Sequence, residues 1–389
     1  SQNKKYWTKF CVRPITDDNE LTVQVAKDNE IWYTSTDNNL IENKVNSKTN
    51  EYQYGLGKIV LADGVIEIAD NAFNRNKTIQ SIFIPSAVKK IGNSSFWECI
   101  NLNSVFISEG VTFIDQYAFG KTPIQSILIP STVQTIATGV FNECTQLQSI
   151  VFHSLPKVEY GFLNCNISTK VLDLKDGEKP YINTSLDNYP SGGFTEAKCA
   201  LTLAKDSWGT VVLPFVPSSE STSNLEFYSY EGVDDGKVYV SETTDIQAGV
   251  PYLVKNVSKD ETTSFTLTAK NPTITLTAGS TSTDGFTFKG CFRSSDVAAN
   301  SNLYYLDGTA FQKATQDNVA PLHAYIVAPE VFEKESMDVV IWNPETAPAP
   351  VFVDGVIPTA TTTGKYGYWL DKSQNKKYWT KFCVRPITD

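Results

Sequence analysis

The most constraining feature of the sequence is a block that recurs between residues 56 and 152. Complete units begin at Leu56, Ile79, Leu102 and Ile124, and a fifth, shortened unit begins at Leu147. Each complete unit has apolar residues at offsets 0, 3, 5, 9 and 12 from its start. Offset 17 is always a phenylalanine: Phe73, Phe96, Phe119 and Phe141. A spacing of 22 or 23 residues between starts predicts a solenoid, in which each unit forms one coil.

The local pattern of each unit predicts a short strand. In the stretch SIFIP, Ile82 and Ile84 alternate with Phe83, as in a strand with one buried face. A single short strand cannot bury that face, so the units must stack and share a core. We expect the second half of each unit to return under its strand, with Phe96 and its equivalents pointing inward.

These units resemble the BspA-like type of leucine-rich repeat, which has the form LxxIxIPxxVxxIgxxAFxxC. The positions that match the pattern beyond its apolar residues are Pro85, Gly92, Cys99, Pro130 and Cys144. Ser108 replaces the proline of the third unit, and the fifth unit is shortened around KVEYGFLNC. The resemblance covers about residues 55–174. It implies a mainly β fold, a solenoid of short parallel strands with little helix, on a secreted or cell-surface bacterial protein.

The segments on either side of the repeats predict a cap and a linker. In residues 1–54, the alternating runs ELTVQVA and IWYTST flank the polar turn KDNE, which predicts an N-terminal β-hairpin cap. Such a cap would cover the open core of the first coil. The solenoid is expected over 55–174, with a last strand at 168–174. Residues 175–193 are rich in Gly, Pro, Asn and Asp without periodicity, and we interpret them as a linker.

Residues 194–345 predict an all-β, sandwich-like domain. Eleven short strand-like runs are separated by Asp-Gly turns at 235–236, 284–285 and 307–308, which are strong hairpin signals. Many short strands without helical patterns indicate a sandwich or a barrel. The stretches WGTVVLPF, IQAGVPYLV, GFTFKGCF and APLHAYIVAP resemble a β-rich module common in secreted bacterial proteins. That resemblance implies architecture and location rather than an activity.

The remaining segment, 346–389, is a Pro- and Thr-rich tail that ends in a duplication. Residues 373–389 are identical to residues 1–17. The repeat units share a fold with far less identity, so the duplication indicates a recent copy rather than a structural requirement. Two interpretations are open: an artificial terminal addition, or the start of the next copy in a tandem array.

The composition excludes several classes of partner. The chain has 389 residues, a net charge of −10 and a pI of about 4.9, and an acidic chain lacks the Lys and Arg that phosphate backbones require. We therefore expect no nucleic-acid partner. The sequence has no apolar run of the roughly 18 to 20 residues that span a bilayer, so no membrane insertion is expected. Secretion or surface display is expected, with any signal or anchor segment outside this chain.

Few residues suggest catalysis or metal binding. The two histidines, His153 and His323, fall in different predicted domains, which disfavours a Ser-His-Asp or Cys-His arrangement and a His-rich metal site. None of the seven cysteines lies in a CxxC pair, and we interpret Cys99, Cys144 and Cys165 as buried free thiols. No catalytic residue, metal or cofactor is therefore predicted.

The candidate ligand-binding site is the outward face of the strands, on the expected concave sheet. The residue between the two core-facing positions of each strand, at offset 4, is apolar in every unit: Val60, Phe83, Phe106, Leu128 and Val151. Amide residues stand beside this column at offset 1: Gln80, Asn103, Gln125 and Gln148. A contiguous exposed apolar column indicates a ligand surface, unless the cap, a loop or another copy of the chain covers it.

Two functions remain from the sequence. The first is a non-enzymatic secreted or cell-surface interaction protein, which binds a protein or glycan through the concave face of its solenoid. The second is a carbohydrate-binding or carbohydrate-active protein with its site in the β domain. The aromatic residues that could stack on sugars there are Trp208, Tyr228, Tyr230, Tyr304 and Tyr305. The oligomeric state is left open.

Overall fold

A computed structural model describes residues 11–15, 20–24, 58–61, 65–77, 79–259, 261, 263–297 and 302–342. These residues form strands and loops, and their only helices are the short 3-10 turns η3 (Ser219–Thr222), η4 (Ser294–Asp296) and η5 (Gln316–Asn318). In these ranges no helix combines the length and the apolar character that crossing a bilayer requires. The chain divides into two compact units, residues 1–202 with 214–221 and 264–277, and residues 203–213 with 222–263 and 278–389.

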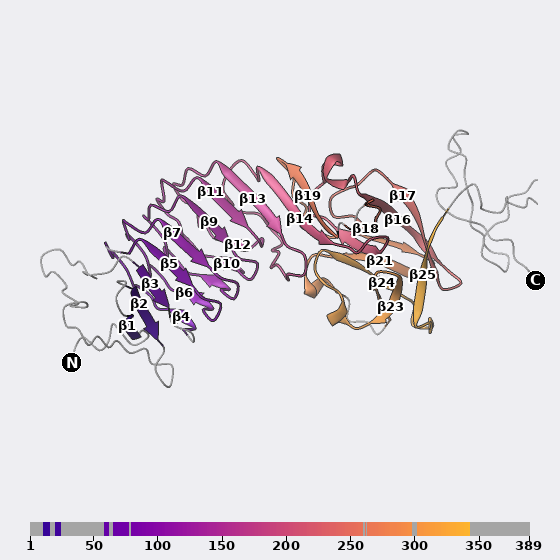
Figure 1. Ribbon diagram of the computed structural model, residues 1–389, viewed down its shortest axis with the longest axis horizontal. Helices are drawn as coiled ribbons and strands as arrows, with labels where there is room; N and C mark the ends of the chain where they lie inside the picture. The colour runs from indigo at the N-terminus through magenta and orange to yellow at the C-terminus, as the bar shows by residue number, and fades with distance from the viewer. Residues whose placement is uncertain are drawn as a thin grey trace, which may run out of the picture. The chain divides into compact units, whose positions relative to one another are not determined.

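The first unit contains the solenoid, and one strand of each coil contributes to a run of side-by-side strands (Figure 1). These strands are β3 (Lys58–Leu61), β5 (Ser81–Ile84), β7 (Ser104–Ile107), β9 (Ser126–Ile129), β11 (Ser149–Phe152) and β13 (Thr169–Leu174). The strands pair in parallel within two groups, β3-β5-β7 and β9-β11-β13. Within each group the pairing is in register with the repeat, because equivalent offsets face each other, as in Ile82 with Val105 and Ile127 with Ile150. The predicted solenoid is therefore confirmed.

A second parallel sheet lies in the returning half of the coils. Its two-residue strands are β4 (Glu67–Ile68), β6 (Lys90–Ile91), β8 (Phe113–Ile114), β10 (Thr135–Ile136) and β12 (Lys157–Val158). The second residue of each of these two-residue strands is buried, so this sheet closes the core opposite the longer strands. Gly92 allows two coils to approach closely here, since a Cβ on it would lie 2.5 Å from the carbonyl oxygen of Ile68.

The phenylalanines at offset 17 form a stacked column inside the solenoid. Their ring centroids are 5.1 Å apart for Phe73 and Phe96, 5.2 Å for Phe96 and Phe119, and 5.7 Å for Phe119 and Phe141. Phe162 of the shortened coil continues the column at 5.3 Å from Phe141. One residue type at one offset thus builds a continuous aromatic core, with each ring stacked on its neighbours.

The late cysteines of the repeats are hydrogen-bond donors, of which Cys99 and Cys144 are buried, as expected, and Cys165 is only half-buried. The thiols of Cys99, Cys144 and Cys165 donate to backbone carbonyls of earlier coils at S···O distances of 2.9, 3.1 and 2.9 Å. Those carbonyls belong to Phe73, Phe119 and Phe141. All three cysteines are free, as expected. Burial raises the pKa of Cys99 and of Cys165 to about 12, so both thiols stay protonated at neutral pH.

The N-terminal end of the strand run matches part of the expected cap. Strand β2 (Glu20–Gln24) falls within the predicted run at 20–26, and it pairs in parallel with β3. Its hairpin partner is β1 (Cys11–Ile15), in antiparallel register. The run at 31–36, which we expected to be that partner, lies outside the described residues.

The C-terminal end of the strand run differs from the expected division at residue 194. Strand β14 (Glu196–Thr202) pairs in parallel with β13, and β19 (Ser264–Lys270) pairs antiparallel with β14. Two strands that we assigned to the β domain therefore extend the solenoid sheet. Extending the sheet satisfies backbone groups of β13 that an edge strand would leave unpaired.

The expected linker, 175–193, packs on the last coils. Ile182 is buried and forms a parallel bridge with Leu155. The hydroxyl of Tyr189 donates to the carbonyl of Pro156 at 2.8 Å, and the amide of Asn188 donates to the carbonyl of Val158 at 3.1 Å. This segment is thus an ordered closing loop of the solenoid rather than a free connection.

The second unit contains a ten-stranded sheet in the order β15-β18-β16-β17-β25-β23-β22-β24-β21-β20. Its strands are β15 (Trp208–Val212), β16 (Leu225–Asp234), β17 (Lys237–Thr243), β18 (Pro251–Asn256), β20 (Ser280–Thr283), β21 (Phe286–Cys291), β22 (Leu303–Leu306), β23 (Ala310–Ala314), β24 (His323–Val327) and β25 (Ser336–Ile341). The three Asp-Gly turns connect β16 to β17, β20 to β21 and β22 to β23, as predicted. An arrangement as a sandwich stays a prediction, and the segment 346–389 lies outside the described residues.

Candidate functional site

The outward face of the solenoid strands carries the predicted apolar column. Phe83 on β5 faces Phe106 on β7, and Leu128 on β9 faces Val151 on β11. The rings of Phe83 and Phe106 stack with centroids 5.2 Å apart and planes 7° from parallel. We call these four residues the apolar ladder. Val60 pairs in register with Phe83, but its side chain lies outside the described residues.

The two phenylalanines at one end of the apolar ladder are open to solvent. The side chain of Phe83 is 47% exposed and that of Phe106 is 54% exposed, whereas Leu128 and Val151 are half-buried. Single exposed apolar residues are common on protein surfaces, but two adjacent exposed phenylalanines are unusual because together they leave a large apolar area in water. Neither ring is covered by the described part of the chain.

The amide residues at offset 1 were predicted to stand beside the apolar column. All four of these residues are exposed: Gln80, Asn103, Gln125 and Gln148. Their backbones hold the coils together, since the N–H of Asn103 donates to the carbonyl of Gln80 at 3.0 Å and that of Gln148 to Gln125 at 2.9 Å. The backbone is thereby fixed while the amide groups point into solvent.

A serine column on the same face was not predicted. The strand residues at offset 2 pair in register across the coils: Ser81 with Ser104, and Ser126 with Ser149. They are exposed or half-buried and lie two residues before the apolar ladder, so they point to the same side of the sheet. Their signal was visible in the sequence as the recurring serine of SIFIP, SVFIS, SILIP and SIVF.

The apolar row ends at a charged pair. Beyond Val151, the same row of the sheet continues through Val171 and Glu196 to Lys270. The ammonium of Lys270 lies 3.2 Å from a carboxylate oxygen of Glu196. The row that contains the apolar ladder is therefore apolar along the coils and becomes charged where β14 and β19 extend the sheet.

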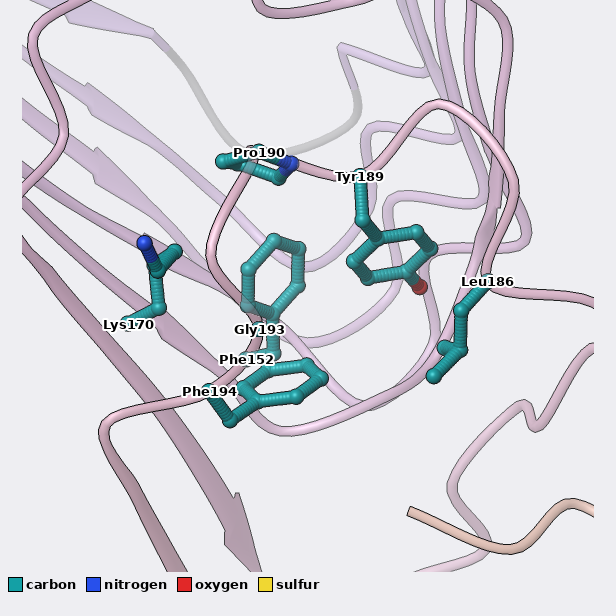
Figure 2. A pocket seen from close by; sticks show the side chains of 7 residues that line it. All are labelled: Phe152, Lys170, Leu186, Tyr189, Pro190, Gly193 and Phe194. Atoms are coloured by element: carbon teal, nitrogen blue, oxygen red, sulfur yellow. The ribbon is translucent and has the colours of Figure 1, made fainter. Parts of the chain in front are cut away.

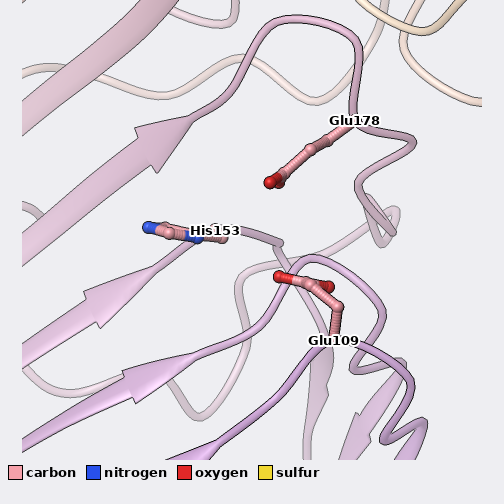
Figure 3. A group of neighbouring side chains, drawn as sticks. All are labelled: Glu109, His153 and Glu178. Atoms are coloured by element: carbon pink, nitrogen blue, oxygen red, sulfur yellow. The ribbon is translucent and has the colours of Figure 1, made fainter. Parts of the chain in front are cut away.

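A second group of polar side chains gathers where several strands end. Glu109 follows β7, His153 follows β11 and Glu178 lies in the loop after β13. Figure 3 shows the two carboxyl groups and the imidazole converging from these separate elements, and one potential ligand atom of each lies within 4.8 Å of the others. The three residues are far apart in the sequence, and sequence reasoning did not group them.

The carboxylates of this group differ in their hydrogen bonding. Glu109 accepts from the backbone N–H of Ser131 at 3.0 Å, the hydroxyl of Ser131 at 2.7 Å and the N–H of Thr132 at 3.2 Å. Glu178 has a buried oxygen, Oε2, without a hydrogen-bond partner. Burial, together with the negative charge of Glu109, raises the pKa of Glu178 above its usual value.

Asp173 borders the group on the far side of His153. Its carboxylate oxygen lies 3.7 Å from Nε2 of His153 and 2.6 Å from Nζ of Lys175. Burial alone would raise the pKa of Asp173, but hydrogen bonding to His153 and Lys175 lowers it to about 2. Asp173 is therefore ionised at neutral pH and can orient the imidazole of His153.

A small apolar pocket of about 160 Å³ lies between the end of the solenoid and its closing loop (Figure 2). Its lining consists of Phe152, Lys170, Leu186, Tyr189, Pro190, Gly193 and Phe194. The buried ammonium of Lys170 donates to the carbonyl of Ser191 at 2.6 Å, and Phe152 packs edge-on against Phe194. The polar group of the pocket is thus already engaged, and the aromatic residues hold the loop in place.

The aromatic residues of the alternative hypothesis are mostly core residues. Tyr228, Tyr230 and Tyr304 are buried in the main hydrophobic cluster of the second unit, and Trp208 packs against it. Tyr305 is half-buried. A residue that stacks on a sugar must expose a ring face. Tyr228, Tyr230 and Tyr304 are buried, so the expectation that they could stack on sugars was wrong.

The sequence matches the family "BspA type Leucine rich repeat region" in six copies, over residues 43–174 and 252–335. The chain therefore belongs to the BspA-type leucine-rich repeat family. The first matched range contains the parallel coils described above. The second range falls on strands β18 to β24, whose described pairings are antiparallel. No curated protein sequence matches the chain.

Several solved structures are similar to this chain. A leucine rich cell surface protein from Faecalibacterium prausnitzii A2-165 is 22% identical, with a TM-score of 0.31, and the match covers 59% of this chain and 58% of that one. A leucine-rich repeat protein from T. pallidum is 20% identical, with a TM-score of 0.30, over 48% of this chain and 82% of that one. One from Bacteroides ovatus ATCC 8483 is 20% identical, with a TM-score of 0.29, over 43% and 47%.

Proposed function

We propose that this chain is a non-enzymatic, secreted or cell-surface interaction protein that binds a protein ligand through the apolar ladder. The observation that carries the proposal is the stacked, half-exposed pair Phe83 and Phe106 on the outward face of the solenoid strands. Secretion or surface display is supported by family membership and by the similarity to a bacterial cell surface protein.

The position of the two rings favours binding. Phe83 and Phe106 lie on strands that pair on a regular sheet, so little conformational entropy would be lost when a partner covers them. Aromatic side chains at the centre of an interface commonly supply most of its affinity. Leu128 and Val151 occupy the same repeat offset on the two following coils, where they form a second, half-buried apolar pair.

The serine and amide columns beside the apolar ladder would supply hydrogen bonds without net charge. Exposed hydroxyls of Ser104 and Ser126 and amides such as Asn103 can donate and accept at the rim of an interface. A polar rim around an apolar centre is the usual composition of a protein–protein contact.

The ring geometry favours a protein over a glycan. Sugars stack on a free aromatic face, but Phe83 and Phe106 turn one face toward each other and their planes are 7° from parallel. One face of each ring is thus closed to a sugar, and the exposed remainder suits contact with apolar side chains of a partner. A glycan ligand is therefore the less favoured outcome of the test.

A binding screen with matched variants tests this function. The full chain, Phe83→Ser/Phe106→Ser and Ile100→Ser would be applied to arrays of extracellular proteins and of glycans. Ile100 is 54% exposed, as Phe106 is, and its repeat offset is outside the strand, so it controls for loss of an exposed apolar side chain.

We expect a protein ligand whose signal is lost in the double variant and retained in Ile100→Ser. The double variant should retain its stability to within about 1 kcal/mol, as surface substitutions do. A ligand that binds the double variant as well as the natural sequence would place the binding surface elsewhere. Signals on the glycan array alone would contradict the preference for a protein.

A further inference from the structure

Glu109, His153 and Glu178 bring metal-binding atoms together from three places in the first unit. Two of the residues follow strands β7 and β11, and the third comes from the loop that closes the solenoid. The carboxyl groups of Glu109 and Glu178 point toward His153 (Figure 3), and one ligand atom of each residue lies within 4.8 Å of the others. This convergence requires no movement of the backbone, because the coils are fixed by the parallel sheets.

The group of Glu109, His153 and Glu178 contains two carboxylates and no lysine or arginine. Two carboxylates are close together, and Oε2 of Glu178 is buried without a hydrogen-bond partner. A buried, unpaired carboxylate oxygen beside another carboxylate costs free energy unless a cation or a proton is added. Glu109 accepts three hydrogen bonds from Ser131 and Thr132. Ser131 also interacts with the carboxyl group of Glu178, so the two carboxylates share this donor.

The neighbouring cation is directed elsewhere. Nζ of Lys175 lies 2.6 Å from Asp173, and Asp173 also faces Nε2 of His153 at 3.7 Å. A carboxylate on one ring nitrogen of a histidine, with the other nitrogen directed at a metal, is a common arrangement around metal ligands. Here it leaves Nδ1 of His153 as the nitrogen available to a cation.

We propose that Glu109, His153 and Glu178 form a binding site for a divalent transition-metal ion of the zinc type, with Asp173 as the residue that positions His153. Imidazole nitrogen suits zinc and its neighbours, whereas calcium prefers six to eight oxygen ligands. Zinc binds nitrogen and carboxylate oxygen at about 2.0 to 2.2 Å, so the ligand atoms must draw closer than 4.8 Å. Rotation of the Glu178 side chain, which comes from a loop, would supply that movement.

The consequence of such a site is a crosslink within the solenoid. An ion held there would join the third coil, the fifth coil and the closing loop at the edge of the strand sheet. Any ligand that binds only the folded state stabilises it by mass action, so the metal would raise the melting temperature. This role is separate from the apolar ladder, whose residues the site does not include.

Calorimetry and thermal melts of the untagged full chain test the site. After dialysis against EDTA, the protein would be titrated with zinc chloride, and in separate arms with calcium chloride and magnesium chloride. We expect one equivalent of zinc to bind, the melting temperature to rise with zinc, and no comparable rise with calcium or magnesium.

Conservative variants assign the binding to the three side chains. Glu178→Gln and His153→Gln should each weaken zinc binding by about tenfold or more, the loss expected even from an orienting partner of a metal ligand. Glu143→Gln is the matched control, because Glu143 is an exposed carboxylate of the same solenoid. In the metal-free state Glu178→Gln should melt at or above the temperature of the natural sequence, because the variant removes a repulsive charge.

Three results would overturn the proposal. The first is the absence of both zinc binding and a zinc-dependent shift in the melt. The second is binding that is unchanged in Glu178→Gln and His153→Gln, which would place the ion elsewhere. The third is a stronger response to calcium or magnesium than to zinc, which would exclude the zinc type.

Discussion

Replacing Phe96 by alanine should be among the most damaging single changes to the solenoid. The ring of Phe96 is fully buried and stacks on Phe73 at 5.1 Å and on Phe119 at 5.2 Å. Removing it deletes two ring contacts and leaves a cavity between coils that the sheets hold at a fixed spacing. Large-to-small changes of a buried phenylalanine cost about 3 to 5 kcal/mol, and this poorly collapsible site should lie in the upper half of that range.

Hydrogen exchange measured by mass spectrometry is the suitable assay, because two compact units make a single global unfolding transition an unsafe assumption. Peptides from residues 79–101 report on the local coil. Phe83→Ala is the matched control in the same coil, since its ring is half-exposed and its loss should cost only about 1 kcal/mol. A loss below about 1 kcal/mol for Phe96→Ala, or an equal loss for both variants, would refute the assigned register.

Two further predictions concern titratable groups. Burial raises the pKa of Cys99 to about 12 and also raises the pKa of Cys144. Iodoacetamide at mildly alkaline pH should therefore label neither thiol until urea is added, as detected by peptide mass spectrometry. Rapid labelling of the native chain would contradict the assigned burial. Hydrogen bonds from the backbone N–H groups of Ala310 and Thr309 lower the pKa of Asp307 to about 2, below its usual value of 3.8. Its contribution to stability is therefore present above the unfolded pKa and is lost as the pH falls through about 2, so the destabilisation by Asp307→Ala in urea melts should shrink over that window. A cost that does not depend on pH would contradict the role of the ionised carboxylate.

The solenoid was predictable because its signal is repeated. Each offset is sampled in several units, so accidental residues average out and the burial of Phe73, Phe96 and Phe119 follows from the pattern. The outward direction of Phe83 and Phe106 follows from the same alternation, because successive strand residues point to opposite faces.

The parts that occur once were harder to predict. Segment 175–193 has a linker-like composition, yet Ile182 and Tyr189 pack it onto the coils, and a single copy gives no pattern to reveal this. The pairing of β14 with β19 joins strands far apart in the chain, which local periodicity does not encode. The local sequence pattern did not show that aromatic residues such as Tyr304 are buried, because tertiary packing buries them.

The polar cluster illustrates the same limit for sites. Glu109 and His153 lie near the same offset of two different coils, whereas Glu178 comes from the closing loop. Only the stacking of the coils and the fold of that loop bring the three side chains together. In contrast, the apolar ladder lies at one offset of consecutive units, and it could therefore be read from the sequence.

The most direct measurement of the central claim is site-specific photo-crosslinking. A benzophenone amino acid, which is close to phenylalanine in shape, would replace Phe106 in one variant and Ile100 in another. On irradiation with the ligand from the array screen, we expect a covalent adduct at position 106 and none at position 100, as detected by mass spectrometry. An adduct at position 100 with none at 106 would show that the ligand does not contact the apolar ladder.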